Sequence, residues 1–236
     1  MIDKTVATCS EAVAKVFDGA TIMVGGFGSP GIPSMLVEAL RKQGAKNLVV
    51  ISNNAGSDDW GLGGLIQDGR VRKLVASFPN SPGADAFKDL YMKGEIELEL
   101  VPQGTLIERI RAGGAGIGGF YTPTGVGTEL AAGKETRVIN GREQVLESPL
   151  YADFTLIKAY RGDRLGNLTY RLAMRNFNPI MATAADVVIA EVDELVPVGT
   201  LGLEEIHTPG IFVDAVVKVE RHPRLFEPQR ARRAKK

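Results

Sequence analysis

Residues 20–33 read Ala20-Thr-Ile-Met-Val-Gly-Gly-Phe-Gly-Ser-Pro-Gly-Ile-Pro33, an apolar run followed by a glycine-rich turn. The run predicts a strand over Ala20–Val24. Pro33 and Ser34 predict the start of a helix that Gly44 ends. A strand that passes through a tight turn into a helix is the repeating unit of an α/β fold.

The same order of strand and helix recurs along the chain. Continuous apolar runs at 48–51 and 187–190 indicate strands buried on both faces. We therefore predict an α/β fold with a mainly parallel sheet flanked by helices. The other predicted strands are Asn47–Ser52, Val71–Ser77, Ile96–Val101, Asp153–Ala159, Asp186–Val192 and Val213–Val219. Further helices are expected from Ser10 as N-cap and over Thr105–Ala112, and Asn140-Gly141 predicts a small antiparallel hairpin near 136–147.

Composition sets the class of protein. The chain has 236 residues, 44% hydrophobic and 24% charged, which suits one large domain that we place at 1–220. Cys9 has no partner for a disulfide, and two histidines, His207 and His222, make a zinc site improbable. No apolar run approaches about 20 residues and no signal peptide is evident, so we expect a cytoplasmic protein that contacts no membrane. Residues 221–236 carry a local charge of +6 and are expected to be a disordered, solvated tail.

The glycine-rich turn allows three interpretations. Gly26–Gly31 matches G-x-G-x-x-G, which would indicate a dinucleotide site. However, the next strand ends in Ser52-Asn53-Asn54 without the expected carboxylate, and Pro30 lies where the dinucleotide helix should begin. A purely structural turn is the second interpretation. We favour the third, a loop whose backbone N–H groups approach an acyl or phosphate-bearing ligand.

Uncharged amides follow other predicted strands. Asn53 and Asn54 come directly after one strand, and Gln103 follows another. Ligands collect at the carboxyl ends of parallel strands, and an amide donor there suits a developing oxyanion. An Asx turn or helix cap is the alternative for the asparagines, and it is the more usual role of such a pair. The glycine-rich segment 112–128 is expected to form neither helix nor strand, but a lid or a backbone-lined binding loop.

An ordered set of motifs resembles the A (alpha) subunit of the family I CoA-transferases, whose fold is similar to that of the sugar-phosphate isomerases. The set runs from about residue 3 to about residue 219. Its members are 18–33, Ser52–Gly56, Val101–Gly114, Phe120–Thr128, Gly133–Arg137, Gly162–Tyr170, Arg175-Asn-Phe-Asn-Pro179 and Thr208–Gly210.

The resemblance implies a reaction in which CoA moves from succinyl-CoA to a 3-oxo acid by ping-pong kinetics. A glutamate nucleophile is expected on a B subunit, in a Ser-Glu-Asn-Gly context that this chain lacks. The resemblance thus implies no catalytic nucleophile, permanent cofactor or metal in this chain, and a heterodimer or A2B2 assembly without nucleic acid. It also implies a role in ketone-body or aromatic-compound degradation.

The resemblance also assigns residues to the site. CoA binding is expected at Gly25, Gly26, Phe27, Gly28, Ser29, Pro30 and Gly31. The acyl and oxyanion pocket is expected at Asn53, Asn54 and Gln103, with Gly125 closing over it.

Two features resemble members with different acceptors. Ala76-Ser-Phe-Pro79 is similar to members that use 3-oxoadipate, and 56–63 to members that use acetoacetate. We slightly favour 3-oxoadipate. Arg70, Arg72 and Lys73 could bind a second carboxylate, although surface solvation is their more usual role. A sugar-phosphate isomerase and the effector-binding domain of a regulator are the remaining alternatives.

Overall fold

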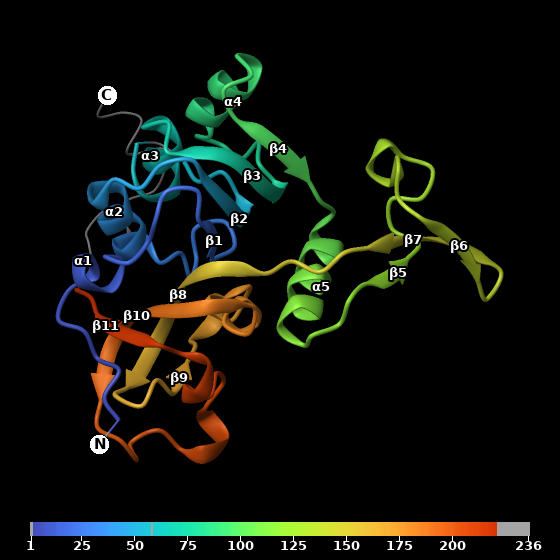
Figure 1. The fold of residues 1–236 in the computed structure, drawn as a ribbon. Coiled ribbons are helices and arrows are strands. Elements are labelled where there is room, and N and C mark those ends of the chain that lie inside the picture. The colour runs from blue at the N-terminus through green and yellow to red at the C-terminus, as the bar shows by residue number, and fades with distance from the viewer. Residues whose placement is uncertain (1, 58, 221–236) are drawn as a thin grey trace.

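The computed structural model describes residues 2–57 and 59–220. The predicted basic tail lies outside the described residues. The chain forms a parallel sheet in the order β11-β10-β8-β1-β2-β3-β4, to which β9 adds one antiparallel strand beside β8 (Figure 1). The strands are β1 (Thr21–Val24), β2 (Leu48–Asn54), β3 (Val71–Phe78), β4 (Glu97–Leu100), β8 (Ala152–Asp163), β9 (Leu168–Thr169), β10 (Ala185–Val196) and β11 (Ala215–Lys218).

Helices cover both faces of this sheet. One layer contains α1 (Cys9–Ala12), α2 (Ser34–Gln43), α3 (Gly61–Gln67) and α4 (Asp85–Met92); the other contains α5 (Gln103–Gly114) and α6 (Asn178–Met181). Alternate side chains of β1 enter the two cores. Ile22 packs in the core that contains Leu36 of α2, whereas Met23 packs in the core that contains Leu106 of α5. The strands are thus buried on both faces, as their continuous apolar runs predict.

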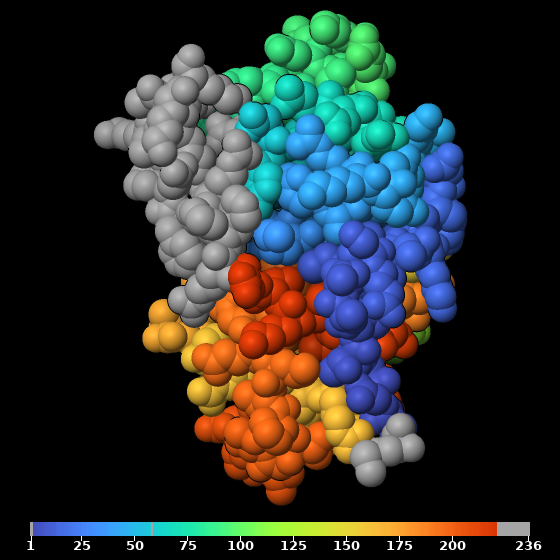
Figure 2. Space-filling view, turned by 90° about the vertical axis from the view of Figure 1, so that its left-hand side faces the viewer, coloured from blue at the N-terminus to red at the C-terminus, as the bar shows by residue number. Residues whose placement is uncertain are grey.

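The N-terminal segment lies against the last strand. The N–H of Val6 donates to the carbonyl of Val216 at 3.0 Å, and the N–H of Val216 donates to the carbonyl of Lys4 at 2.8 Å. Figure 2 shows this segment in dark blue beside the red C-terminal strand region. The two ends of the described chain therefore close the same edge of the sheet.

A small antiparallel sheet forms an arm that projects from the main body (Figure 1). Its order is β5-β7-β6, with β5 (Phe120–Thr122), β6 (Thr136–Ile139) and β7 (Arg142–Glu147). Asn140 and Gly141 have φ angles of 50° and 74°, as a type I′ turn requires. The predicted hairpin is confirmed.

The predicted fold class, all seven predicted parallel strands and the predicted helix after β4 are confirmed, but two local predictions are wrong and the bounds of that helix differ. Helix α1 is capped by Thr8, whose side chain accepts the N–H of Glu11, and not by Ser10. Helix α5 extends beyond Thr105–Ala112 at both ends. The segment 112–128 contains the end of α5 and the strand β5, because β5 gains backbone pairing from β7.

Four short 3₁₀ helices complete the described chain: η1 (Glu129–Ala131), η2 (Leu172–Met174), η3 (Leu203–Glu205) and η4 (Gly210–Phe212). Across the part of the chain that the structure describes, every helix is too short or too polar to cross a membrane.

Candidate active site

A cavity of about 560 Å³ opens at the carboxyl ends of β1, β2 and β3, beside the start of α5. Because these strands are parallel neighbours, the segments that follow them meet at one edge of the sheet. The lining residues are Phe27, Gly28, Ser29, Ile32, Asn53, Asn54, Gly56, Ser57, Ser77, Phe78, Ser81, Pro82 and Gln103. The amides that the sequence places after separate strands thus share one cavity.

The loop Gly25–Pro33, which we call the glycine loop, forms one wall. Gly26, Gly28 and Gly31 have φ angles of +113°, +61° and +72°, a region that favours glycine. The N–H of Phe27 donates to the carbonyl of Pro30 at 3.1 Å, which closes a turn. This turn brings the backbone of the loop, without bulky side chains at the three glycines, close to the cavity.

Only part of the predicted CoA-binding segment faces this cavity. Phe27, Gly28 and Ser29 line it. Pro30 and Gly31 line a second cavity of about 380 Å³, together with Ser29. Gly25 and Gly26 are buried at the end of β1. The glycine loop therefore separates the two cavities. Its first two residues, Gly25 and Gly26, line neither cavity and connect the loop to β1.

Asn53 is the centre of the polar network in the cavity. Its Nδ2 donates to Ser77 Oγ at 3.0 Å and to Gln103 Oε1 at 3.2 Å. Its Oδ1 accepts the N–H of Gly28 at 3.4 Å. Asn53 therefore links the glycine loop, the end of β3 and the start of α5, although it is only 3% exposed.

Gln103 contributes the exposed amide of this network. Since its Oε1 accepts from Asn53, its Nε2 is oriented away from Asn53 and available as a donor. An uncharged donor at such a place stabilises an oxyanion without protonating a carboxylate nucleophile. Gln103 is the first residue of α5, which fixes the position of its backbone.

Asn54 occupies the same wall in a different role. Its Oδ1 accepts the N–H of Gly56 at 2.8 Å, which is an Asx turn. Its Nδ2 donates to the carbonyl of Gly28 at 3.4 Å and to Asn53 Oδ1 at 3.3 Å. The Asx turn considered for the asparagine pair is therefore formed by Asn54. Asn53 instead links the polar groups of the cavity by hydrogen bonds.

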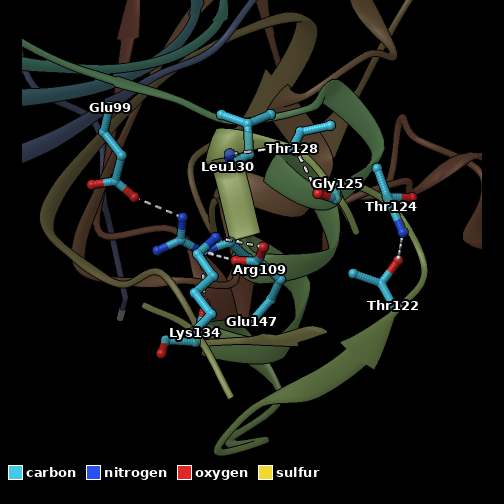
Figure 3. A network of polar contacts seen from close by, with 10 residues as sticks. Glu99, Arg109, Thr122, Thr124, Gly125, Thr128, Leu130, Lys134 and Glu147 are labelled. Carbon is cyan, nitrogen blue, oxygen red and sulfur yellow. Dashed lines mark hydrogen bonds and ion pairs between the residues drawn. The ribbon is translucent and has the colours of Figure 1, made fainter. Parts of the chain in front are cut away.

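Gly125 lies in the arm and not in the lining of the cavity within this chain. Thr128 Oγ1 donates to the carbonyl of Gly125 at 2.7 Å, and the N–H of Thr124 donates to Thr122 Oγ1 at 3.2 Å (Figure 3). These bonds shape the start of the connection between β5 and β6. The role of Gly125 as a residue that closes over the site stays a prediction.

Ion pairs anchor the arm where β7 returns to the body (Figure 3). Glu147 is 3% exposed, and its Oε1 lies 2.6 Å from Lys134 Nζ. Arg109 of α5 lies 2.7 Å from Glu99 Oε1 and 3.8 Å from Glu147 Oε2. The guanidinium of Arg109 therefore connects β4 with the base of the arm.

Among the residues that the structure describes, all that line the larger cavity are uncharged. The cations considered for a second carboxylate lie at the opposite, amino-terminal end of β3. Arg70 donates to the carbonyl of Gly44, Arg72 donates to that of Asn47, and Lys73 is paired with two glutamates of β4. These three residues have structural partners outside the cavity. The described residues also contain no cluster of three or more potential metal ligands.

Ser77, Phe78 and Ser81 are lining residues that the sequence did not assign to the site. Ser77 Oγ donates to the carbonyl of Asn53 at 3.3 Å, and Ser81 Oγ donates to that of Gly56 at 3.2 Å. One feature of the sequence could have indicated Ser77. It lies near the end of a predicted strand, as Asn53 does, and the glycine loop follows another predicted strand.

Comparison with known proteins identifies the class to which this fold and cavity belong. The family model for Coenzyme A transferase matches residues 6–219, so the chain belongs to the Coenzyme A transferase family. The enzyme class inferred from the ordered motifs is thereby confirmed, in preference to a sugar-phosphate isomerase or a regulator domain.

Individual relatives agree with this placement. The chain is 58% identical to the A subunit of the 3-oxoadipate CoA-transferase of Pseudomonas putida over 219 residues, covering 93% of this chain and 95% of that protein. It is 47% identical to the A subunit of the succinyl-CoA:3-ketoacid coenzyme A transferase of Helicobacter pylori J99 over 234 residues, covering 99% and 100%. Among solved structures, an acyl-CoA transferase of E. coli O157:H7, in a thioester complex with CoA, has a TM-score of 0.82 and 23% identity. The match covers 96% of this chain and 49% of that one, and it concerns the fold alone.

Proposed function

We propose that this chain is the A subunit of a 3-oxoacid CoA-transferase that moves CoA from succinyl-CoA to a 3-oxo acid. The observation that carries the proposal is a cavity built from hydrogen-bonded amides, Asn53 and Gln103, beside the glycine loop, with no carboxylate among the described residues that line it. Such a cavity can hold a thioester carbonyl and its oxyanion, but its described residues offer no carboxylate nucleophile. The nucleophilic glutamate then belongs to a B subunit, and the assembly is a heterodimer or A2B2.

The reaction follows from this division. The partner's glutamate carboxylate attacks the carbonyl carbon of the thioester, and the oxyanion that forms accepts hydrogen bonds from donors such as Gln103 Nε2. The C–S bond breaks, the CoA thiolate leaves, and an acyl–glutamyl anhydride remains. The thiolate then attacks the glutamyl carbonyl, which gives an enzyme–CoA thioester and releases the donor acid. The acceptor carboxylate reverses these steps, so the two half-reactions alternate.

We propose 3-oxoadipate as the preferred acceptor, ahead of acetoacetate. The relative from Pseudomonas putida supports this choice, since it is a 3-oxoadipate CoA-transferase by name. Hydroxyl and amide groups of Asn53, Ser77, Ser81 and Gln103 line the cavity, so several neutral polar groups could surround the second carboxylate of a dicarboxylic acid in place of a cation.

The test is steady-state kinetics of this chain assembled with its B subunit. We expect CoA transfer from succinyl-CoA to both acids, with a higher kcat/KM for 3-oxoadipate, and no transfer by this chain alone. Equal or reversed kcat/KM values would overturn the acceptor preference. Absence of transfer to any 3-oxo acid would overturn the proposed function. The mass of the complex in solution distinguishes the heterodimer from A2B2.

A further inference from the structure

A residue of the motif at 175–179 contacts the glycine loop on the side away from the larger cavity. The cavity described above does not explain the role of this motif. Asn178 begins α6 and is fully buried, with 0% exposure. Its Nδ2 donates to the carbonyl of Gly31 at 3.0 Å and to that of Met174 at 2.9 Å. Its Oδ1 accepts the N–H of Lys158 on β8 at 3.0 Å. One amide therefore joins the loop to α6 and to the central sheet.

The side-chain amide of Asn178 occupies space that is free only because two residues of the loop are glycines. A methyl group at Gly25 would overlap Asn178 Oδ1, and a Cβ at Gly31 would lie 2.8 Å from Asn178 Nδ2. Gly25 does not have a positive φ angle, so its lack of a side chain is required by space and not by backbone conformation. The amide of Asn178 is thus enclosed between both ends of the turn.

A second buried residue fixes the end of the loop where it enters α2. Glu191 of β10 has 0% exposure, and its Oε2 accepts the N–H groups of Met35 and Leu36, both at 2.9 Å. Lys158 Nζ lies 3.3 Å from Glu191 Oε1 and 2.7 Å from Asp193 Oδ1, so one ammonium group faces both carboxyl groups. Burial raises the pKa of Glu191. The loop is therefore fixed at its junction with α2 as well as at Gly31.

We propose that Asn178 is a positioning residue for acyl-CoA turnover, and that it acts by holding Gly25 and Gly31 so that the glycine loop keeps its shape. The inference rests on the proposed function, because it assumes that the loop faces the CoA thioester. Gly28 N–H reaches Asn53 Oδ1 across the cavity wall, so a shift of the loop also disturbs the amide network. A displacement of about 1 Å near reacting groups can cost about 100-fold in rate.

The test compares three variants of this chain, each in complex with its B subunit: Asn178→Ala, Gly25→Ala and the double variant. We expect Asn178→Ala to lower kcat/KM for succinyl-CoA by about 10- to 100-fold. Gly25→Ala should cause a larger loss, because its methyl group overlaps the amide. In the double variant the two overlapping Asn178 atoms are gone and Leu156 O, the next nearest atom, lies at 3.5 Å, an ordinary van der Waals contact, so its kcat/KM should equal that of Asn178→Ala.

Asn167→Ala is the matched control. Asn167 Nδ2 donates to Asp163 at 2.9 Å and its Oδ1 accepts the N–H of Gly210 at 2.9 Å, so it also joins distant segments, but at the β8–β9 turn. Loss of these bonds should lower thermal stability and leave kcat/KM unchanged. Amide hydrogen exchange gives a second readout: residues 26–32 should exchange faster in Asn178→Ala than in wild type or Asn167→Ala.

Several results would overturn the inference. These are unchanged kinetics in Asn178→Ala, additive losses in the double variant, or unchanged exchange of the loop. If Asn178→Ala does not assemble, Asn178→Asp replaces it, because the carboxylate keeps the size and the acceptor for Lys158 but cannot donate to Gly31 O. The same loss of kcat/KM is then expected. A wild-type complex without CoA transfer would instead overturn the proposed function, which keeps the two failures distinct.

Discussion

Asn53 Nδ2 donates to Gln103 Oε1 across 3.2 Å, although β2 carries one residue and α5 the other. This bond determines which end of the Gln103 amide points into the cavity. Because the acceptor oxygen is occupied by Asn53, the amide nitrogen of Gln103 points away from Asn53 and can donate to a ligand in the cavity. The orientation of the Gln103 amide, the oxyanion donor in our proposal, thus depends on a neighbour that is itself nearly buried.

Substitution of either amide should therefore lower turnover without preventing assembly. Gln103→Ala removes the donor and should reduce kcat by about 10²- to 10³-fold, the usual effect of losing one oxyanion donor. Asn53→Ala should cost at least as much, because it also releases Gly28 and Ser77. Steady-state kinetics of the assembled complex measures both, with exposed Gln67→Ala as control. Wild-type kcat in both variants would remove these residues from the site.

Arg109 should contribute to stability through its position at the base of the arm. Arg109→Met leaves the Ser148 carbonyl and Glu99 without their 2.7 Å partner and should lower the free energy of unfolding by about 3 kcal/mol. Arg111→Met removes only an exposed pair with Glu108 and should cost about 0.5 kcal/mol or less. Urea denaturation at one fixed protein concentration measures both. Equal losses of unfolding free energy in the two variants would show that the buried ion pairs of Arg109 stabilise the fold no more than the exposed pair of Arg111.

Cys9 should be chemically inert. Burial, as the main cause, and the negative charge of Glu191, as the second, raise the pKa of the Cys9 thiol to about 11. At pH 7 about one molecule in 10⁴ then carries the reactive thiolate. Iodoacetamide should label Cys9 slowly in the native protein and rapidly in urea, and Cys9→Ala should keep full turnover. Rapid native labelling accompanied by loss of activity would contradict this account.

His207 should make stability fall below neutral pH. Its Nδ1 accepts the N–H of Tyr170 at 2.9 Å, and burial, followed by the charge of Arg175, lowers its pKa. At mildly acidic pH the folded state therefore binds fewer protons than the unfolded state. The stability that neutral His207 contributes is complete above its unfolded-state pKa of about 6.5, and it is lost as the pH falls from there through the lower folded-state pKa.

His207→Asn supplies the comparison, because an amide oxygen can accept the same bond without titrating. The decrease in the urea midpoint between pH 7.5 and 5.5 should be smaller in this variant than in wild type. An equal decrease in both proteins would assign the pH dependence to other groups.

The sequence predicts the sheet well because its signal is local. The continuous apolar run Leu48-Val-Val-Ile51 indicates a strand buried on both faces, and the structure places it inside the sheet, between β1 and β3. Helix α3 was missed because Gly61-Leu-Gly-Gly-Leu has poor helix propensity. Tertiary packing explains these glycines: Gly63 lies against Gly56, and Gly64 lies under the guanidinium of Arg41.

The site was predictable only in part for a similar reason. Asn53 and Gln103 stand at strand ends, where parallel sheets collect ligands, so their position made them candidates and the family resemblance assigned them to the pocket. Ser81 lies in the loop between β3 and α4, and its contact with Gly56 depends on how distant parts of the chain fold together. Asn178 lies 147 positions from the glycine it binds, a separation at which a single sequence gives no pairing signal.

The central claim is that this chain supplies the substrate cavity while its partner supplies the nucleophile. Intact mass spectrometry of the two-subunit complex, after incubation with succinyl-CoA and no acceptor, tests it most directly. The account predicts a mass gain of CoA minus water on a glutamate of the partner chain, and none on this chain. An adduct on this chain, or CoA transfer by this chain alone, would contradict it.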